Sequence, residues 1–378
     1  MGGHFVRRAP PEMPCVLPRA TLREKLNTKK PLPAVILRAM NQASIKTVIV
    51  GAGGWGRQHA RALLAHPDID LRAVMARTPE KAAARAAEFH IKPYSSLPEM
   101  LTNERPDLVA LCLPNQEHFA PTMEVIQAGI PLLVEKPLVF DLGEADALLR
   151  AAAAKNLFFA INFNHRYGRP AQMARAAIAA GELGEIVHAT WRFGGEANVS
   201  SHPHANLIET QCHGFDQLEF LCGPIASVMA EMTRQTGGGF RTVALSVRFA
   251  SGAVGNMLGT YDSSYAYRDA HRLEIGGTRG QIIIEDTVRR YTLQRAGRET
   301  AEIWEAGYFN DNARAFQHTF DAYLLAMIEA FKNKKQPPVH ARAGRRALAL
   351  AWAAVESFTT GKRIDVPVDP VSDAAPDM

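Results

Sequence analysis

The sequence predicts an α/β protein with an N-terminal Rossmann domain, built on a doubly wound parallel sheet, and a C-terminal α/β domain with an open, mostly antiparallel sheet. Its 378 residues exceed the usual size of one hydrophobic core, so two domains are expected. From residue 45, short apolar runs alternate with helical patterns, as they do in parallel sheets. From Val187 onward, apolar and polar residues alternate singly, which is typical of half-exposed strands.

The first half supports the Rossmann prediction element by element. A β-branched run at 45–50 is followed by glycines and by a helical pattern at 55–65. The remaining expected strands are 71–76, 108–113, 131–134 and 158–163, and the clearest further helices are 79–89 and 142–155. We place this domain at residues 44–164.

In the second half the hydrophobic pattern changes from apolar runs to single alternation of apolar and polar residues. Strands are expected at 187–193, 243–249, 273–275, 281–285 and 291–293, and two late helical patterns at 316–331 and 345–358. A sheet with one covered face leaves the other face available for pairing with a second copy. We assign residues 165–366 to this domain and expect the helices near 311–360 to pack back on the body. Residues 1–43, rich in proline and without periodicity, are expected to be a disordered or loosely packed extension, and 367–378 a tail.

A glycine-rich turn follows the first strand. It consists of Gly51, Ala52, Gly53, Gly54, Trp55 and Gly56. Such a turn at a helix N-terminus lets a pyrophosphate approach free backbone N–H groups. Any tight turn can contain glycines, but a strand before the motif and a helix after it are the context that supports dinucleotide binding.

The end of the second strand bears on the choice between NADP and NAD. A carboxylate there would bind the ribose 2′-hydroxyl of NAD, and this sequence has Arg77 and Thr78 instead. Arg77 can pair with a 2′-phosphate, so NADP is favoured over NAD, although an ordinary exposed arginine would look the same in sequence.

Composition excludes several classes. The net charge of +5 is spread along the chain rather than clustered, which argues against a nucleic-acid partner. No apolar run is long enough to cross a bilayer, so no membrane partner is expected. The four cysteines have neither zinc-finger spacing nor disulfide density, and no export signal follows Arg7-Arg8, so the cytoplasm is the expected location.

Further motifs, in order along the chain, are Pro114-Asn115-x-x-His118, Glu135-Lys136-Pro137 and Asn164-His165-Arg166-Tyr167. With the glycine turn, they make residues from about 45 to about 366 resemble the glucose-fructose oxidoreductase / inositol dehydrogenase (Gfo/Idh/MocA) family. The resemblance implies that Lys136 lies near the nicotinamide and the reacting hydroxyl. It also implies cofactor contacts from Pro114, Asn115, His118 and Glu135.

A second family motif, a helix carrying Asp-x-x-x-His-x-x-Asp, corresponds here to Glu209, His213 and Asp216. Their spacing puts all three on one helix face, which in isolation would also suit a solvated stripe. With Lys136 present, we assign His213 as general acid/base, Lys136 as the stabiliser of the reacting oxygen, and Glu209 as an orienting carboxylate. The expected substrate contacts are Arg166, Tyr167, Asn206, Glu209 and His213. Because the family more often has aspartate at position 209, the substrate orientation is expected to differ.

The resemblance implies an NAD(P)-dependent dehydrogenase or reductase that acts on a carbinol or carbonyl of a sugar, sugar derivative or cyclitol. Family members often form dimers or tetramers through the C-terminal sheet, so a homodimer or homotetramer is expected. A glycosidase that uses NAD transiently and a non-catalytic nucleotide-binding regulator remain alternatives. No metal is expected, since the proline in His202-Pro203-His204 breaks a regular ligand geometry.

Overall fold

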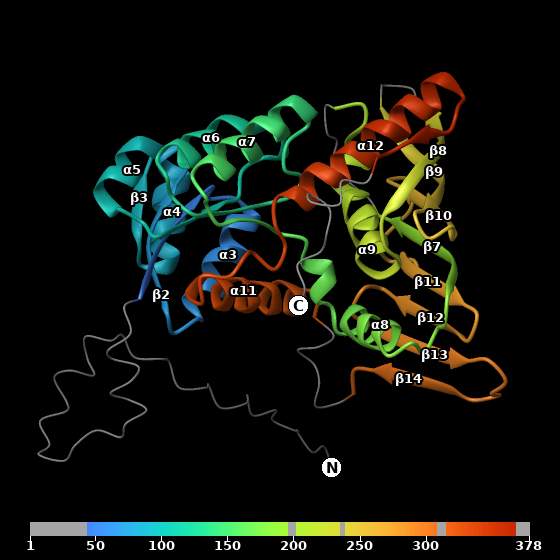
Figure 1. The fold of residues 1–378 in the computed structure, drawn as a ribbon. Coiled ribbons are helices and arrows are strands. Elements are labelled where there is room, and N and C mark those ends of the chain that lie inside the picture. The colour runs from blue at the N-terminus through green and yellow to red at the C-terminus, as the bar shows by residue number, and fades with distance from the viewer. Residues whose placement is uncertain (1–43, 196–201, 235–238, 308–314, 368–378) are drawn as a thin grey trace, which may run out of the picture. The chain divides into compact units, whose positions relative to one another are not determined.

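The computed structural model describes residues 44–195, 202–234, 239–307 and 315–367. The expected extension at 1–43 and all but the first residue of the expected tail lie outside these ranges. Within them, two sheets and their covering helices account for the fold (Figure 1).

The first sheet has six parallel strands in the order β3-β2-β1-β4-β5-β6, which confirms the doubly wound Rossmann prediction. Its strands are β1 (Ile45–Val50), β2 (Ile69–Met75), β3 (Lys92–Tyr94), β4 (Leu108–Leu111), β5 (Leu132–Val134) and β6 (Phe159–Ile161). Its helices are α3 (Gly54–Leu64), α4 (Pro79–Phe89), α5 (Leu97–Glu104), α6 (Phe119–Gln127) and α7 (Leu142–Ala154). The carboxyl ends of β1, β4 and β5 carry the glycine turn, Pro114 and Glu135, so parallel pairing brings the motifs to one edge.

Strand β3 was not predicted, and its position explains why. It has only three residues, one of them Pro93, and it lies at the edge of the sheet. A proline is tolerated on an edge strand because one side of that strand needs no ladder hydrogen bonds. Such a segment therefore has neither the length nor the apolar pattern that marks a buried strand.

The second sheet has nine strands in the order β14-β13-β12-β11-β7-β10-β9-β8-β15. Neighbouring strands are antiparallel except β7 and β10, as the prediction of a mostly antiparallel sheet requires. The strands are β7 (Ile186–Gly194), β8 (Ile225–Arg234), β9 (Phe240–Phe249), β10 (Val254–Thr260), β11 (His271–Gly277), β12 (Gly280–Glu285), β13 (Arg290–Arg295), β14 (Ala301–Glu305) and β15 (Ile364–Asp365).

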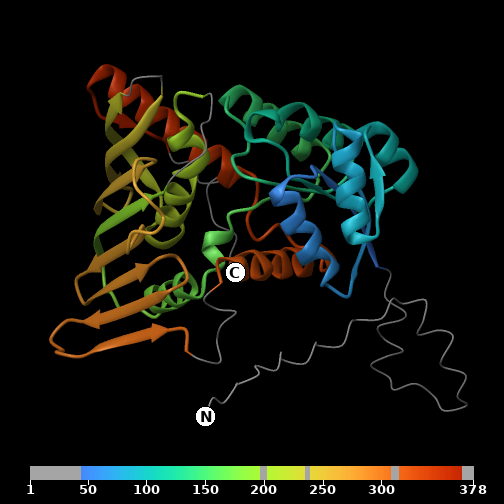
Figure 2. The ribbon, with the colours of Figure 1, turned by 180° about the vertical axis from the view of Figure 1, so that it is seen from behind.

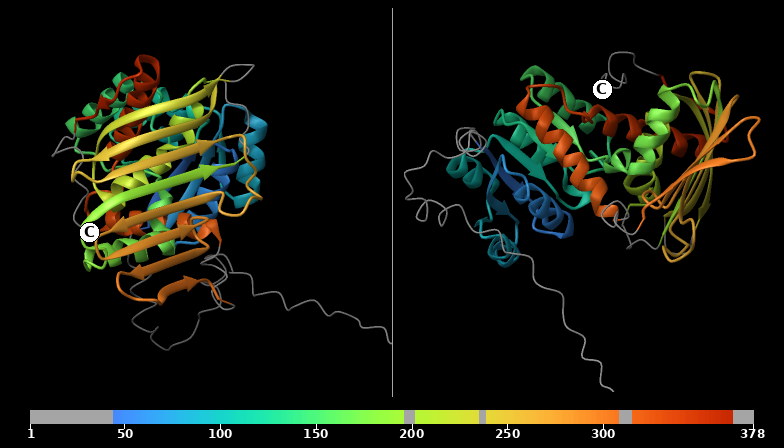
Figure 3. Two further views of the ribbon diagram at one scale, coloured as in Figure 1. Left: turned by 90° about the vertical axis from the view of Figure 1, so that its right-hand side faces the viewer. Right: turned by 90° about the horizontal axis from the view of Figure 1, so that it is seen from below.

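The helices α8 (Arg169–Ala179), α9 (Cys212–Cys222) and α12 (Arg342–Thr360) pack against one face of this sheet (Figure 3). Trp191 and Met257 point towards them and are buried. On the opposite face, Met229, Val254 and Leu258 are 40%, 53% and 39% exposed. This open face is continuous over the central strands and is not covered by any helix of the described residues (Figure 3).

Two late helices tie the halves together. Helix α11 (Phe316–Lys332) lies against α3, as Figure 2 shows from behind, and Tyr323 donates a 2.7 Å hydrogen bond to the Ile161 carbonyl of β6. Helix α12 packs on the second sheet, and its Trp352 donates a 2.9 Å bond to the Phe140 carbonyl. No helix in the described ranges is both long and apolar enough for a bilayer span.

Candidate active site

The glycine turn has the tight geometry that its sequence predicts. Gly51 has φ +117°, and a Cβ added there would lie 2.2 Å from the Cys112 carbonyl oxygen. At Gly56 an added Cβ would lie 1.9 Å from the Gly51 carbonyl oxygen. Around Gly53 and Gly54 an added Cβ meets nothing within 4 Å. Packing thus requires the first and last glycines, whereas the middle pair faces open space.

The first turn of α3 is free to receive an anion. The helix begins at Gly54 with Gly53 as N-cap, no side chain caps it, and no acidic residue lies in its first turn. Backbone N–H groups at such an end bind phosphate well because they have no partner within the helix. The residues therefore fit a dinucleotide pyrophosphate. Trp55, 47% exposed, stacks on Phe320 of α11 with ring centroids 5.9 Å apart.

Arg77 lies just after β2 and forms an ion pair with Glu117 that was not predicted from the sequence. Its Nη2 lies 2.8 Å from Glu117 Oε1, and its side chain is 75% exposed. Glu117 belongs to the 3₁₀ helix Asn115–Glu117 that follows β4. The exposed Thr78 precedes α4 without capping it. Arg85 of α4, also missed, donates to the Ala52 carbonyl inside the glycine turn.

Glu135 is buried directly after β5. It accepts hydrogen bonds from Asn162 Nδ2 at 2.7 Å and pairs with His59 Nε2 at 2.8 Å. Burial alone would raise the pKa of Glu135, but these two partners and the charge of Lys136 lower it on balance. The carboxylate thus fixes the backbone next to Lys136, joining it to α3 through His59.

His118 is also buried and connects two loops. Its ring nitrogens lie 2.7 Å from the Pro137 carbonyl oxygen and 3.0 Å from that of Leu113. Burial lowers the pKa of His118. His118, predicted as a cofactor contact, therefore connects the loop after β4 to the loop after β5 by hydrogen bonds. Pro114 is exposed and Asn115 half-buried at the same edge.

Lys136 connects the Rossmann half to the second half. Its Nζ donates a 3.1 Å hydrogen bond to the backbone carbonyl of Glu209, and the peptide to Pro137 is cis. The lysine is half-buried, as is Glu209. Lysine and glutamate, predicted from separate motifs, therefore lie together.

The helix that carries the second motif is not continuous, which corrects the prediction of one helix face for all three residues. Residues Asn206–Thr210 form a π-helical turn, closed by a 2.8 Å bond from the Gln211 amide to the Asn206 carbonyl. Helix α9 starts only at Cys212. The wider turn displaces Glu209 from the spacing assumed for one α-helix. His213 and Asp216 are 6% and 4% exposed, so a solvated stripe is wrong.

A buried amide network holds this turn in place. Trp191 Nε1 donates to Gln211 Oε1 at 2.9 Å, and Gln211 Nε2 donates to Asn206 Oδ1 at 3.0 Å. Asn206 Nδ2 donates to the carbonyls of Arg241 and Gly259 at 2.7 and 3.1 Å. The side-chain amide of Asn206, which was expected to contact substrate, thus bonds other groups of the protein. Gln211 and Trp191 were missed because neither belongs to a polar pattern.

Arg166, also expected to contact substrate, pairs with Asp216. Its Nε and Nη2 lie 2.9 and 2.6 Å from the two carboxylate oxygens. Burial raises the pKa of Asp216 and outweighs the opposing effect of Arg166. The neighbouring Tyr167 packs edge-on against Tyr323 at 5.3 Å, and burial raises its pKa to about 12.

Two further buried histidines, His165 and His271, lie near the proposed acid/base His213. His213 stacks on His165 with centroids 4.0 Å apart, and His271 meets His165 edge-on at 6.0 Å. Burial, reinforced by neighbouring positive charge, lowers the pKa of His213 and of His165 well below the ordinary value. Burial lowers that of His271 to about 3. His213 is therefore a neutral imidazole at neutral pH, the form that accepts a proton.

Other polar groups play packing roles. His202 packs on Phe140 at 4.8 Å, and His204 stacks on Phe240 at 5.0 Å. Tyr261, noted in the sequence beside the motif, shares a 2.7 Å hydrogen bond with Thr210. Both histidine rings thus pack against aromatic side chains.

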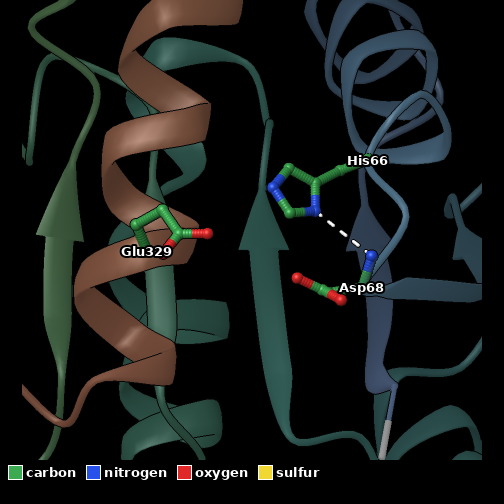
Figure 4. A group of neighbouring side chains, drawn as sticks. All are labelled: His66, Asp68 and Glu329. Atoms are coloured by element: carbon green, nitrogen blue, oxygen red, sulfur yellow. Dashed lines mark hydrogen bonds between the residues drawn. The ribbon is translucent and has the colours of Figure 1, made fainter. Parts of the chain in front are cut away.

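A separate group of possible metal ligands consists of His66, Asp68 and Glu329, at the edge of a cavity between α3 and α11 (Figure 4). The Asp68 amide donates a 3.3 Å hydrogen bond to His66 Nδ1, drawn as the dashed line in Figure 4. Lys332 already supplies a cation to this group, since its ammonium pairs with Asp68 and lies 3.4 Å from Glu329. The group is thus a salt-bridge cluster on the surface of the Rossmann half.

Comparisons with known proteins agree with both halves of the fold. The model of an oxidoreductase family with an NAD-binding Rossmann fold matches residues 45–163, and its companion, the C-terminal α/β domain, matches 175–367. Inositol 2-dehydrogenase of Rhizobium meliloti (strain 1021) is 25% identical over 343 residues, covering 85% of this chain and 99% of that protein. D-xylose 1-dehydrogenase (NADP(+)) of Hypocrea jecorina (strain ATCC 56765 / BCRC 32924 / NRRL 11460 / Rut C-30) is 30% identical over 159 residues, 39% of this chain and 41% of that one.

A solved structure of levoglucosan dehydrogenase, in complex with NADH and levoglucosan, has a similar fold. Its TM-score is 0.77 at 20% identity, covering 86% of this chain and 100% of that one.

Proposed function

Because the chain is an oxidoreductase of the glucose-fructose oxidoreductase / inositol dehydrogenase (Gfo/Idh/MocA) family, we propose that it transfers hydride between nicotinamide and a carbinol or carbonyl of a sugar, sugar derivative or cyclitol. The observation that carries the proposal is the bond from Lys136 Nζ to the Glu209 carbonyl. It joins the lysine of the Rossmann half to the motif that holds His213.

The residues divide the work as follows. The glycine turn Gly51–Gly56 would hold the pyrophosphate of a nicotinamide dinucleotide, which when bound would supply or accept the hydride. In oxidation, His213 takes the hydroxyl proton as its neutral imidazole. Lys136 donates a hydrogen bond to the same oxygen and stabilises the negative charge that develops there. Glu209 orients a substrate hydroxyl, and Arg166 holds α9 through Asp216. In reduction the proton moves in the opposite direction.

NADP is the cofactor we propose as preferred. Arg77 offers a guanidinium at the edge where the adenosine ribose would lie, and no carboxylate ends β2. The NADP(+) named for the Hypocrea relative supports its use within the family, although that likeness spans a minority of both chains.

We also propose that copies pair through the open face of the second sheet, where Met229, Val254 and Leu258 are exposed. A homodimer or homotetramer is expected, and light scattering on the purified chain measures it. Cys112, Cys212 and Cys222 are free thiols, which supports a reducing compartment such as the cytoplasm.

The test is a panel of sugars and cyclitols, including myo-inositol, D-xylose and levoglucosan, assayed with NAD and NADP at the nicotinamide absorbance. We expect turnover with at least one member, reduced about 100-fold or more in Lys136→Ala and in His213→Ala while cofactor binding persists. Unchanged turnover in both variants would contradict these roles. Release of free sugar from a glycoside without net absorbance change would instead favour the glycosidase.

A further inference from the structure

His165 has no assigned role, yet it is the residue that lies flat on His213. It comes from the 3₁₀ helix Asn164–Tyr167, and its ring is parallel to that of His213 within 10° at a centroid distance of 4.0 Å. Phe316 and Phe193 contact the His165 ring edge-on at 5.4 and 5.9 Å. Only 3% of His165 is exposed. The packing therefore leaves the ring little freedom.

A catalytic imidazole is ordinarily oriented by a carboxylate, and within the described ranges none is bonded to His213 Nδ1. Its Nδ1 is buried and, among the residues that the structure describes, has no hydrogen-bond partner. The nearest carboxylate on the same helix, Asp216, accepts from Arg166 with both oxygens. With Nδ1 unbonded, ring contacts hold this side of the imidazole, and those are His165 on its face and Phe163 at its edge, 5.8 Å away.

We propose that His165 is a positioning residue, which holds the His213 imidazole in the orientation for proton transfer by stacking on it. The proposal rests on the function proposed above, in which His213 is the acid/base. Parallel stacking fixes the plane of a ring, and the edge contact of Phe163 limits its rotation within that plane. His165 thereby does by packing what a carboxylate does elsewhere by hydrogen bonding.

The charges around His213 give the stacked pair a second property. Besides burial, three positively charged or chargeable groups disfavour a proton on the His213 ring. They are His165 from its 3₁₀ helix, Lys136 from the loop after β5, and His271 from β11. Of the neighbouring acids, Asp216 is bonded to Arg166, and Glu209 has its backbone carbonyl bonded to Lys136. A proton on one of the two stacked rings therefore opposes a proton on the other. His165 helps to keep His213 neutral as the pH falls.

Two substitutions separate these effects. His165→Phe keeps a flat ring on His213 but removes the proton site, whereas His165→Ala removes both. We expect His165→Phe to retain kcat within about threefold and to move the protonation of His213 to higher pH, because the opposing charge is gone. We expect His165→Ala to lower kcat about tenfold or more, because a misplaced base transfers protons poorly, while NADPH binding is unchanged.

The full-length protein labelled with 13Cε1-histidine gives the direct measurement. The His213 signal, assigned by its loss in His213→Gln, is followed by NMR through a pH titration, and kcat is measured across the same range with the best substrate of the panel. His340→Phe is the control, since His340 is a partly buried imidazole that packs on Phe159 rather than on His213. We expect the His213 titration in that variant to match the wild type.

Full kcat in His165→Ala, or a loss of kcat in His165→Phe of about tenfold or more, would overturn the positioning role. An unshifted His213 titration in His165→Phe would contradict the electrostatic effect. If His165→Ala fails to fold, kcat of His165→Phe decides alone. Because the NMR result needs no substrate, a shifted titration without turnover on the panel would leave the coupling of the two rings standing and count against the proposed function.

Discussion

At the scale of single residues, Arg77 is the side chain that we expect to decide between the cofactors. Replacing it with alanine removes the cation offered to a 2′-phosphate. We predict that Arg77→Ala weakens NADPH binding about tenfold or more, as befits the loss of a charge-assisted contact, and changes NADH binding little. Titration of cofactor fluorescence at fixed salt measures both.

Arg57→Ala is the control for that prediction. Arg57 is an exposed arginine of α3 that pairs with Glu88, so its loss changes the net charge equally. It is expected to leave the ratio of NADPH to NADH affinity unchanged. Equal weakening of both cofactors by Arg77→Ala would mean that Arg77 does not recognise the 2′-phosphate.

The glycines of the turn provide a second residue-scale prediction. Gly56→Ala would push a Cβ against the Gly51 carbonyl at 1.9 Å, whereas at Gly54 an added Cβ meets nothing within 4 Å. We predict that Gly56→Ala destabilises the fold by about 1–3 kcal/mol, because the backbone of the glycine turn must shift to admit the Cβ. The same shift is expected to weaken cofactor binding. Denaturant unfolding of both variants checks this. Because alanine favours a helix more than glycine does, Gly54→Ala is expected to keep or raise stability, and a similar loss there would contradict the role of the close contact at Gly56.

At the scale of elements, the π-helical turn before α9 depends on one buried amide. Gln211 bonds Trp191 and Asn206 and is fully buried. Gln211→Ala leaves their polar groups without partners, which costs about 1–3 kcal/mol for each buried group, and lets Glu209 move. We predict lower unfolding stability and a raised KM for the sugar, with cofactor binding retained.

Gln294→Ala, an exposed glutamine on β13, is the matched control and is expected to leave both quantities unchanged. If Gln211→Ala alters stability but not KM, the turn does not set the position of Glu209 for substrate.

The strands and helices also show which parts of the fold and of the site could be predicted from the sequence. Alternation of apolar runs and helices predicted the parallel sheet, because buried strands must be apolar throughout. The family resemblance, rather than any spacing, suggested that Lys136 and Glu209 serve one site, and in the structure Lys136 Nζ bonds the Glu209 carbonyl. Local spacing could not predict that Arg166 binds Asp216 or that Asn206 binds the carbonyls of Arg241 and Gly259, because those partners are set by the packing of distant strands and helices. A single inserted residue in a helical turn likewise leaves no periodic signal.

At the scale of the whole molecule, the buried histidines make stability depend on pH. His165, His213 and His271 have folded-state pKa values below the ordinary 6.5 that they regain on unfolding. Below pH 6.5 the unfolded chain therefore binds more protons, and stability falls as the pH falls. Each group contributes up to about 1.4 kcal/mol per pH unit.

We accordingly predict that Tm drops steeply between pH 6.5 and 5. His271→Phe keeps a flat ring against Trp191 but removes one of these protons, so its slope of stability against pH should be shallower by about one proton. Thermal unfolding at several pH values measures both. A Tm that stays level over this range would show that these rings are protonated in the folded chain.

The bond from Lys136 to the Glu209 carbonyl also determines how the enzyme would respond to movement. Its donor and acceptor belong to different halves, which α11 and α12 hold together. A hinge opening of about 1 Å at this point would separate the ammonium from the acid/base helix, and a misplacement of that size can cost about 100-fold in rate. The glycine turn lies wholly within the Rossmann half, so such an opening would leave its affinity for the nucleotide unchanged. Substitutions along α12 could thus change turnover without changing nucleotide affinity.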